Sequence, residues 1–203
     1  MKIFCIGRNY VAHAKELNNE VPDEPIVFMK PKSALLQAHT PFYYPEFTNE
    51  LHFECELVLR ISKNGKYIQD RFASKYYDAV TVGIDFTARD IQNELKEKGL
   101  PWEKAKAWDN SAVIGTWIPF TNIKNKKDIN FCMYKNKELM QQGNSQLMIN
   151  SFDKIVAYIS NYFSVNIGDL VFTGTPAGVG ECVVGDELEA FIEDDSLLTV
   201  EIK

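Results

Sequence analysis

The segment from Phe53 to Ile61 constrains the fold more than any other part of the chain. Apolar residues occupy every second position in it, and Glu54 and Glu56 lie between them. Successive side chains of a strand point to opposite faces, so this alternation predicts a β-strand with one face on a hydrophobic core. Asn64-Gly65 follows, and this pair favours a tight hairpin turn. The chain is therefore expected to build a sheet with a buried face.

The remaining pattern predicts an α+β protein dominated by sheet. Further strands are expected at Lys2–Ile6, Ile26–Met29, Ala79–Phe86, Leu170–Thr173, Glu187–Ile192 and Leu197–Ile202, with a hairpin of Phe131–Lys135 and Lys137–Gln141 around Asn136. Helices are expected from Tyr10 to Leu17 after an Asn9 cap, from Ala88 to Lys98 between a Thr87 capping box and Gly99, and from Asp153 to Phe163. Strands and helices do not alternate regularly, which argues against a doubly wound parallel sheet. No linker or repeat interrupts the 203 residues, so residues 1–203 are predicted to form one domain.

Composition and charge exclude several classes of function. The net charge is −6 and the isoelectric point is near 5.2, which argues against nucleic-acid and anionic-membrane partners. No run approaches the roughly 18 apolar residues of a membrane span, and the apolar start is too short for a signal peptide. The four cysteines form no CxxC pair and are interpreted as reduced thiols. We therefore expect a cytoplasmic protein. The lysine-rich stretch 96–106 is interpreted as solvated surface.

Three carboxylates are candidate metal ligands. Glu54 and Glu56 are two apart in a predicted strand and share a face. If that face is open to water, they form the ordinary polar side of an edge strand. If it lines a pocket, a divalent cation would relieve their repulsion, and all-oxygen ligands select Mg²⁺ or Mn²⁺. Asp85 ends an apolar run, where it is either a third ligand or an acid at the start of a helix.

His13 and Glu16 are candidates for acid–base chemistry. They are three residues apart on a predicted helix and share a face. A carboxylate beside an imidazole can orient the ring and raise its basicity, as a general base requires. An unimportant surface pair is the alternative. His39 and His52 have no zinc-ligand spacing.

The segment Gly174–Gly180 lacks the glycine order of a nucleotide-binding loop. It is either a glycine-rich turn or a loop that brings backbone amides and the Thr175 hydroxyl close to a carboxylate ligand.

Five stretches in this order and spacing resemble the fumarylacetoacetate hydrolase family, and most closely its small acylpyruvate hydrolase and oxaloacetate decarboxylase members. The stretches are Ile6–Tyr10 with His13 and Glu16, Leu51–Leu57, Asp85–Gln92, Gly99–Trp102 leading to Lys106, and Gly168-Asp169 leading to Thr173–Gly180. The resemblance extends from residue 3 to about residue 200. It implies a mixed β-roll (a β-sandwich or barrel) with short peripheral helices, a lid helix within residues 1–20, and a homodimer.

The resemblance also implies a role for each matching position. Glu54, Glu56 and Asp85 match the metal carboxylates, and Lys106 matches a lysine that contacts the bound oxo acid. Arg89, Gln92 and Thr175 match polar contacts to the substrate or its carboxylate. His13 and Glu16 match a dyad in the lid helix. The implied cofactor is Mg²⁺, with Mn²⁺ as an alternative and Ca²⁺ as a substitute in crystals.

The function this implies is metal-dependent chemistry on 2-oxo acids through a chelated enolate at C3. Hydrolysis of an acylpyruvate and decarboxylation of oxaloacetate would both give pyruvate. The alternative is an isomerase or tautomerase of 2-hydroxy-diene-dioates or oxaloacetate on the same scaffold. A more remote alternative is a protein that binds 2-oxo acids without catalysis.

Overall fold

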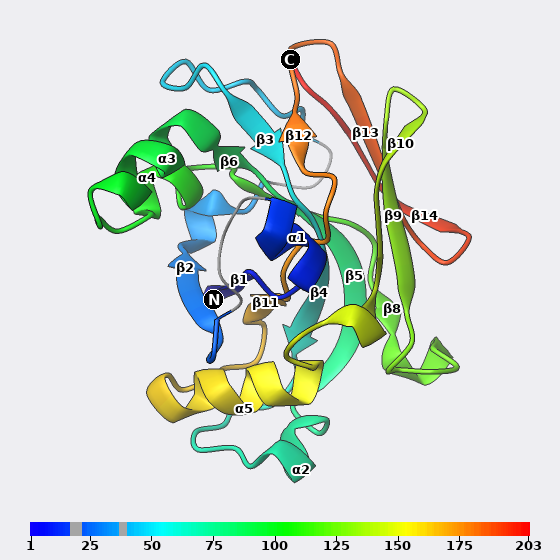
Figure 1. The fold of residues 1–203 in the computed structure, drawn as a ribbon. Helices are drawn as coiled ribbons and strands as arrows, with labels where there is room; N and C mark the ends of the chain where they lie inside the picture. Colours follow the sequence, from blue (N-terminus) through cyan, green and yellow to red (C-terminus); the bar gives the residue numbers. More distant parts are fainter. Residues whose placement is uncertain (17–21, 37–39) are drawn as a thin grey trace.

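The structure is a computed structural model that describes residues 1–16, 22–36 and 40–203 (Figure 1). Its largest sheet has seven strands in the order β2-β1-β11-β4-β5-β7, with β8 also pairing with β5. These strands are β1 (Ile3–Gly7), β2 (Ile26–Lys30), β4 (Cys55–Ile61), β5 (Tyr77–Asp85), β7 (Ala112–Ile114), β8 (Ile118–Pro119) and β11 (Leu170–Phe172). The β1–β11 pair is parallel and the other pairs are antiparallel. The sheet is therefore mixed.

Two smaller sheets complete the strand structure of the described residues. One has the order β10-β9-β13-β14 and is made of β9 (Asn130–Lys135), β10 (Glu138–Asn144), β13 (Glu187–Ile192) and β14 (Asp195–Glu201). The other has the order β12-β3-β6 and is made of β3 (Leu51–Phe53), β6 (Thr87–Ala88) and β12 (Gly180–Glu181). The sheets share one large hydrophobic core, to which strands of all three contribute.

The helices are short and lie around the sheets (Figure 1). They are α1 (Val11–Glu16), α2 (Asp70–Ala73), α3 (Arg89–Glu97), α4 (Glu103–Lys106) and α5 (Phe152–Tyr162), with 3-10 turns η1 (Lys32–Ala34), η2 (Phe120–Asn122) and η3 (Ser145–Leu147). The apolar face of α5 buries Ile155, Val156 and Ile159, in the spacing that the sequence indicates. Among the described residues, no helix is both long and apolar enough to cross a membrane. The α+β expectation with mixed sheets and peripheral helices is confirmed.

Most of the predicted elements are present, but three local predictions are wrong. Asn64-Gly65 does not form a tight hairpin, because residues 62–76, including α2, connect β4 to β5. Thr87 does not cap α3: it pairs in β6, and Ala88 precedes the helix without a side-chain cap. The side chain of Asn9 bonds to Asn150 and Thr173 rather than to α1. The predicted position Leu17 and the candidate His39 lie outside the described residues.

Candidate metal centre and active site

Three carboxylates come together at one end of the β4–β5 pair. Glu54 lies between β3 and β4, Glu56 lies on β4, and Asp85 ends β5. The Asp85 amide donates to the Glu54 carbonyl at 2.9 Å, which fixes the two backbones side by side. One oxygen of each carboxylate lies within 4.8 Å of the others, and all three side chains are buried. In the described part of the chain, this is the only group of three Asp, Glu, His or Cys residues placed to hold a metal ion.

The position of β4 excludes the interpretation of Glu54 and Glu56 as the polar side of an edge strand. β4 lies between β11 and β5, so it is an inner strand. Its second face carries Val58, which packs in a separate small core with Ile3 and Phe172. Glu56 is only 2% exposed. Burying charged carboxylates is expensive unless they are paired or bind a metal, so this arrangement requires compensating cations.

Protein cations surround the carboxylates. Lys106 donates to Glu54 Oε2 at 2.7 Å and to Asp85 Oδ2 at 2.8 Å, and Arg89 donates to Glu54 Oε1 at 2.6 Å. Burial alone would lower the pKa of Lys106, but Asp85 and Glu54 outweigh burial and raise that pKa. The buried ammonium therefore keeps its charge beside two of the candidate ligands.

Lys30, at the end of β2, adds a further buried cation. Its ammonium donates to the Lys106 carbonyl, to the Ser111 carbonyl at 3.1 Å and to Ser111 Oγ at 2.9 Å. These bonds use its three protons. Asp85 Oδ1 lies 2.7 Å from the same ammonium but makes no hydrogen bond to it. Lys30 thus supplies charge to Asp85, while its protons tie α4 to the loop before β7.

The donor set fits a hard divalent cation. Asp85 Oδ1 is buried and has no hydrogen-bond partner among the described residues, whereas buried polar atoms are normally bonded. Its one close polar neighbour is the Lys30 ammonium, which makes an ion pair with it but no hydrogen bond, and an oxygen not committed to a hydrogen bond is what a metal ligand needs. Three carboxylate oxygens at one point favour Mg²⁺, Mn²⁺ or Ca²⁺ over softer ions. Glu54, Glu56 and Asp85 are therefore the residues that could hold such an ion.

The electrostatics of Glu54 and Glu56 differ sharply. Burial raises the pKa of Glu56, and the neighbouring Asp85 and Glu54 charges raise it further. Burial would also raise the pKa of Glu54, but Lys106 and Arg89 outweigh it and hold that pKa below its usual range. Glu56 is thus the carboxylate whose charge most needs an added cation.

The glycine-rich loop supplies a backbone amide to Glu56. Gly174 N donates to Glu56 Oε2 at 2.7 Å. Gly174 has φ +100°, and a Cβ there would lie 2.7 Å from Asn9 Cβ, so a residue with a side chain would be strained. The Thr175 hydroxyl donates to the Cys55 carbonyl and accepts from Gln141 Nε2, each at 2.8 Å. The loop is therefore more than a glycine-rich turn, because it brings a backbone amide close to a candidate carboxylate ligand.

Asn9 fixes the turn between β1 and α1. Its amide nitrogen donates to the carbonyls of Asn150 at 3.0 Å and Thr173 at 2.8 Å, and its oxygen accepts from Asn150 N at 2.8 Å. The preceding residue, Arg8, has φ +57°. Such left-handed backbone is unfavourable for a residue with a side chain and persists where the surroundings enforce it. The Asn9 hydrogen bonds provide that enforcement.

The dyad His13 and Glu16 is present on α1. His13 Nδ1 lies 3.2 Å from Glu16 Oε2, and Glu16 Oε1 accepts from Gly178 N at 3.0 Å. His13 is buried. With Nδ1 protonated towards the carboxylate, Nε2 carries the basic lone pair. Glu16 therefore both orients the imidazole and ties α1 to the glycine-rich loop.

A small cavity of about 30 Å³ gathers these side chains. All nine residues predicted for the site except Glu16 line it, and Glu16 contacts His13 behind it. Gln92 Oε1 accepts from Arg89, which joins two of the predicted substrate contacts. The wall also includes Arg8, Phe28, Lys96 and Trp102.

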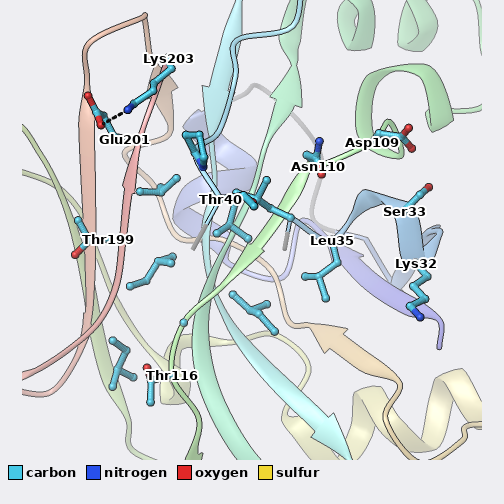
Figure 2. Close-up of a pocket in the computed structure, with 18 of the residues that line it drawn as sticks. Lys32, Ser33, Leu35, Thr40, Asp109, Asn110, Thr116, Thr199, Glu201 and Lys203 are labelled. Atoms are coloured by element: carbon cyan, nitrogen blue, oxygen red, sulfur yellow. Dashed lines mark ion pairs between the residues drawn. The ribbon is translucent and has the colours of Figure 1, made fainter. Parts of the chain in front are cut away.

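A larger groove of about 1190 Å³ lies elsewhere, between η1, β7 and β14. In Figure 2, Lys32 and Ser33 border one side, and the ion pair of Glu201 with Lys203 borders the other. None of the predicted site residues lines this groove. The chemistry-bearing residues are therefore concentrated in the small cavity.

Sequence reasoning missed four residues around the cavity: Arg8, Lys30, Lys96 and Trp102. The interpretation of residues 96–106 as solvated surface is wrong for Lys96, which lines the cavity, and for Lys106, which is buried, whereas Lys98 and Lys104 are exposed. Lys30 ends an apolar strand, and this placement in the sequence was the available signal for a buried cation.

Comparison with known proteins identifies close relatives over nearly the whole chain. The family model described as "Fumarylacetoacetate (FAA) hydrolase C-terminal" matches residues 2–203. The oxaloacetate tautomerase FAHD1, mitochondrial, of Mus musculus is 38% identical over 191 residues, which cover 94% of this chain and 86% of that protein. The oxaloacetate tautomerase YcgM of Escherichia coli (strain K12) is 37% identical over 199 residues, covering 98% and 91%.

A solved structure agrees with these sequence relatives. The crystal structure of fumarylpyruvate hydrolase from Pseudomonas aeruginosa in complex with Mn²⁺ and pyruvate superposes with a TM-score of 0.94. The identity is 35%, and the match covers 100% of this chain and 89% of that one. The predicted β-roll of this type is thereby confirmed.

Proposed function

This chain belongs to the fumarylacetoacetate hydrolase family, and we propose that it is an enzyme that converts small 2-oxo acids through an enolate, using a divalent cation held by Glu54, Glu56 and Asp85. The observation that carries the proposal is the buried carboxylate triad within 4.8 Å, opening on the cavity that His13 also lines. The relatives are enzymes, which disfavours the alternative of a non-catalytic binding protein.

A divalent cation at the triad would act as a Lewis acid on the 1-carboxylate and 2-oxo oxygens of the substrate. Lys106, which bonds to Glu54 and Asp85, places a fixed positive charge where negative charge develops on the 2-oxo oxygen. Arg89 and Gln92 line the same cavity and orient the oxo acid. Thr175 shapes the wall, because its hydroxyl proton is already donated to the Cys55 carbonyl.

His13 is the proposed proton-transfer residue, and Glu16 positions it. With a substrate that enolises, His13 Nε2 takes a proton from C3 and delivers it to the 2-oxo oxygen to give the enol, and the reverse transfer restores the keto form. With an acylpyruvate, His13 Nε2 takes a proton from water, and the water oxygen bonds to C4. The C3–C4 bond then breaks, C4 leaves as the carboxyl carbon of an acid, and C3 takes up a proton to give pyruvate.

The names of the relatives favour oxaloacetate tautomerisation as the reaction to test first. Acylpyruvate hydrolysis is the second candidate, favoured by the fumarylpyruvate hydrolase neighbour with Mn²⁺ and pyruvate. Decarboxylation of oxaloacetate proceeds through the same enolate and belongs to the same test. We propose Mg²⁺ as the physiological ion, with Mn²⁺ as a functional replacement.

We further propose that residues 1–203 act as one catalytic domain, with α1 as the lid, within a homodimer. The proposed partner is a small 2-oxo acid rather than nucleic acid or membrane. Cytoplasmic localisation stays a prediction, and the mouse relative bears "mitochondrial" in its name. Light scattering on a sizing column measures the oligomeric state, and a monomer would contradict the dimer.

The test uses metal-stripped protein with and without added Mg²⁺ or Mn²⁺. Enol-to-keto exchange of oxaloacetate is followed by ultraviolet absorbance, and pyruvate formation from oxaloacetate and acetylpyruvate is followed by a coupled assay. We expect metal-dependent turnover in wild type and none above the metal-free level in Glu56→Ala. Glu138→Ala, which removes an exposed strand glutamate, is the matched control. Wild-type activity in Glu56→Ala would refute the site assignment.

A further inference from the structure

Two cations at the cavity have no carboxylate in direct contact among the described residues. Arg8 lies in the turn after β1, and Lys96 lies on α3, so they come from segments far apart in sequence. Both line the same cavity as the carboxylate triad. Among the described residues, neither makes an ion pair or a side-chain hydrogen bond, and Lys96 contacts only the Trp102 ring, 6.0 Å from its centroid. Neither charge is therefore paired directly with a carboxylate, although Glu54 acts on Lys96 at longer range.

The positive charges around Lys96 also act unfavourably on its ammonium. The pKa of Lys96 is lowered to about 8, first by burial and then by Arg89, with Arg8 and Lys106 lowering it further against the opposing effect of Glu54. Bringing like charges together is unfavourable in the protein alone. A bound anion would reverse that penalty, since it favours the charged form of both groups.

The backbone at Arg8 supports the same conclusion. Arg8 has φ +57°, and the hydrogen bonds of Asn9 to Asn150 and Thr173 hold the turn in this conformation. Unfavourable backbone of this kind concentrates at binding and catalytic sites. Here it places Arg8 at the cavity, and guanidinium groups suit carboxylates because their paired N–H donors match the two oxygens.

The charge of the cavity wall indicates which substrates it suits. The lining has four Lys or Arg side chains and three carboxylates, so it has one excess positive charge before any divalent cation is counted. Arg89 and Lys106 are engaged with the triad, which leaves Arg8 and Lys96 for the far end of the substrate. A monocarboxylic oxo acid would leave them unpaired.

We propose that Arg8 and Lys96 form a subsite for the second carboxylate of dicarboxylic 2-oxo acids. The subsite makes the enzyme selective for substrates such as oxaloacetate over acylpyruvates with a neutral tail. This inference rests on the proposed function, in which the triad and Lys106 hold the 1-carboxylate and 2-oxo end. Arg8 and Lys96 are specificity residues in this scheme and take no part in proton transfer.

The binding test uses malate and lactate, two 2-hydroxy acids that differ in the second carboxylate and cannot enolise. Calorimetry with Mg²⁺-loaded protein should show that wild type binds malate at least tenfold more tightly than lactate. Arg8→Gln with Lys96→Met should remove this preference and leave lactate affinity within about twofold of wild type. Lys98→Met, which removes the exposed lysine at the C-terminal cap of α3, is the charge-matched control and should keep the preference.

Kinetics provide the second readout. The double variant should raise the KM for oxaloacetate about tenfold or more and leave the inhibition constant of oxalate unchanged, because oxalate lacks a remote carboxylate. Equal binding of malate and lactate by wild type would overturn the subsite, as would equal weakening of malate and lactate in the variant. A malate preference in a protein without oxo-acid turnover would refute the proposed reaction and leave the subsite standing.

Discussion

Replacing Lys30 by Met tests whether the buried cation compensates the carboxylate triad. The Lys30 side chain is fully buried and its ammonium lies 2.7 Å from Asp85 Oδ1. Removing one member of a buried ion pair costs about 3–5 kcal/mol, because the other charge stays buried. Asp85 keeps its bond to Lys106, which places the expected loss near the lower end, at about 3 kcal/mol. Met has a similar length, so the loss from a cavity is small.

Two measurements on the metal-free protein give this loss, urea unfolding and thermal unfolding. At roughly 2–4 °C per kcal/mol for a chain of this size, the midpoint of thermal unfolding should fall by about 6–12 °C. The urea m-value should not change, since the variant exposes the same surface on unfolding. Lys66→Met is the control: Lys66 also donates to a carbonyl, that of Tyr162, but at an exposed position. A loss below about 1 kcal/mol for Lys30→Met would show that Asp85 does not depend on this cation and would refute the reasoning.

Three further predictions follow from the same geometry. The raised pKa of Glu56 means that a proton competes with the metal, so calorimetry should show weaker Mg²⁺ binding at pH 6 than at pH 8, and equal affinities would contradict this. Gly174→Ala should destabilise the protein by about 1–3 kcal/mol and weaken Mg²⁺ binding, because its Cβ would displace the loop from Asn9 and the amide from Glu56. Burial raises the thiol pKa of all four cysteines, so a thiol reagent at pH 8 should label only the half-buried Cys132 in the native protein and all four in urea.

The carboxylate triad was predictable because each member leaves a local trace in the sequence. Alternation places Glu54 and Glu56 on one face of a strand, and Asp85 ends an apolar run. Sequence could not show whether that face meets water, since this depends on β11, which lies more than a hundred residues further along the chain and pairs with β4. The wrong cap at Thr87 has a similar origin: Thr87 pairs with His52 in a sheet, and tertiary pairing overrides the local signal.

Residues defined by distant partners escaped prediction. Lys30 depends on Asp85 and Ser111, which are remote in sequence. Lys96 lies in a lysine-rich stretch that is typical of surface, and only the fold turns it towards the cavity. The family resemblance covers the proposed catalytic positions, but nothing local to Arg8 signals that the hydrogen bonds of Asn9 hold it in left-handed backbone.

The insertion of β11 between β1 and β4 has a consequence for how the chain folds. β11 pairs with β1 in parallel and with β4 antiparallel, so the centre of the large sheet closes only when residues 170–172 reach the strands of the N-terminal part. Contacts of such long sequence separation slow folding. During synthesis, β4 would wait with an unpaired apolar edge until residues 170–172 emerge from the ribosome. We therefore expect chains that stop before β11 to aggregate, although all three candidate metal ligands have by then been made.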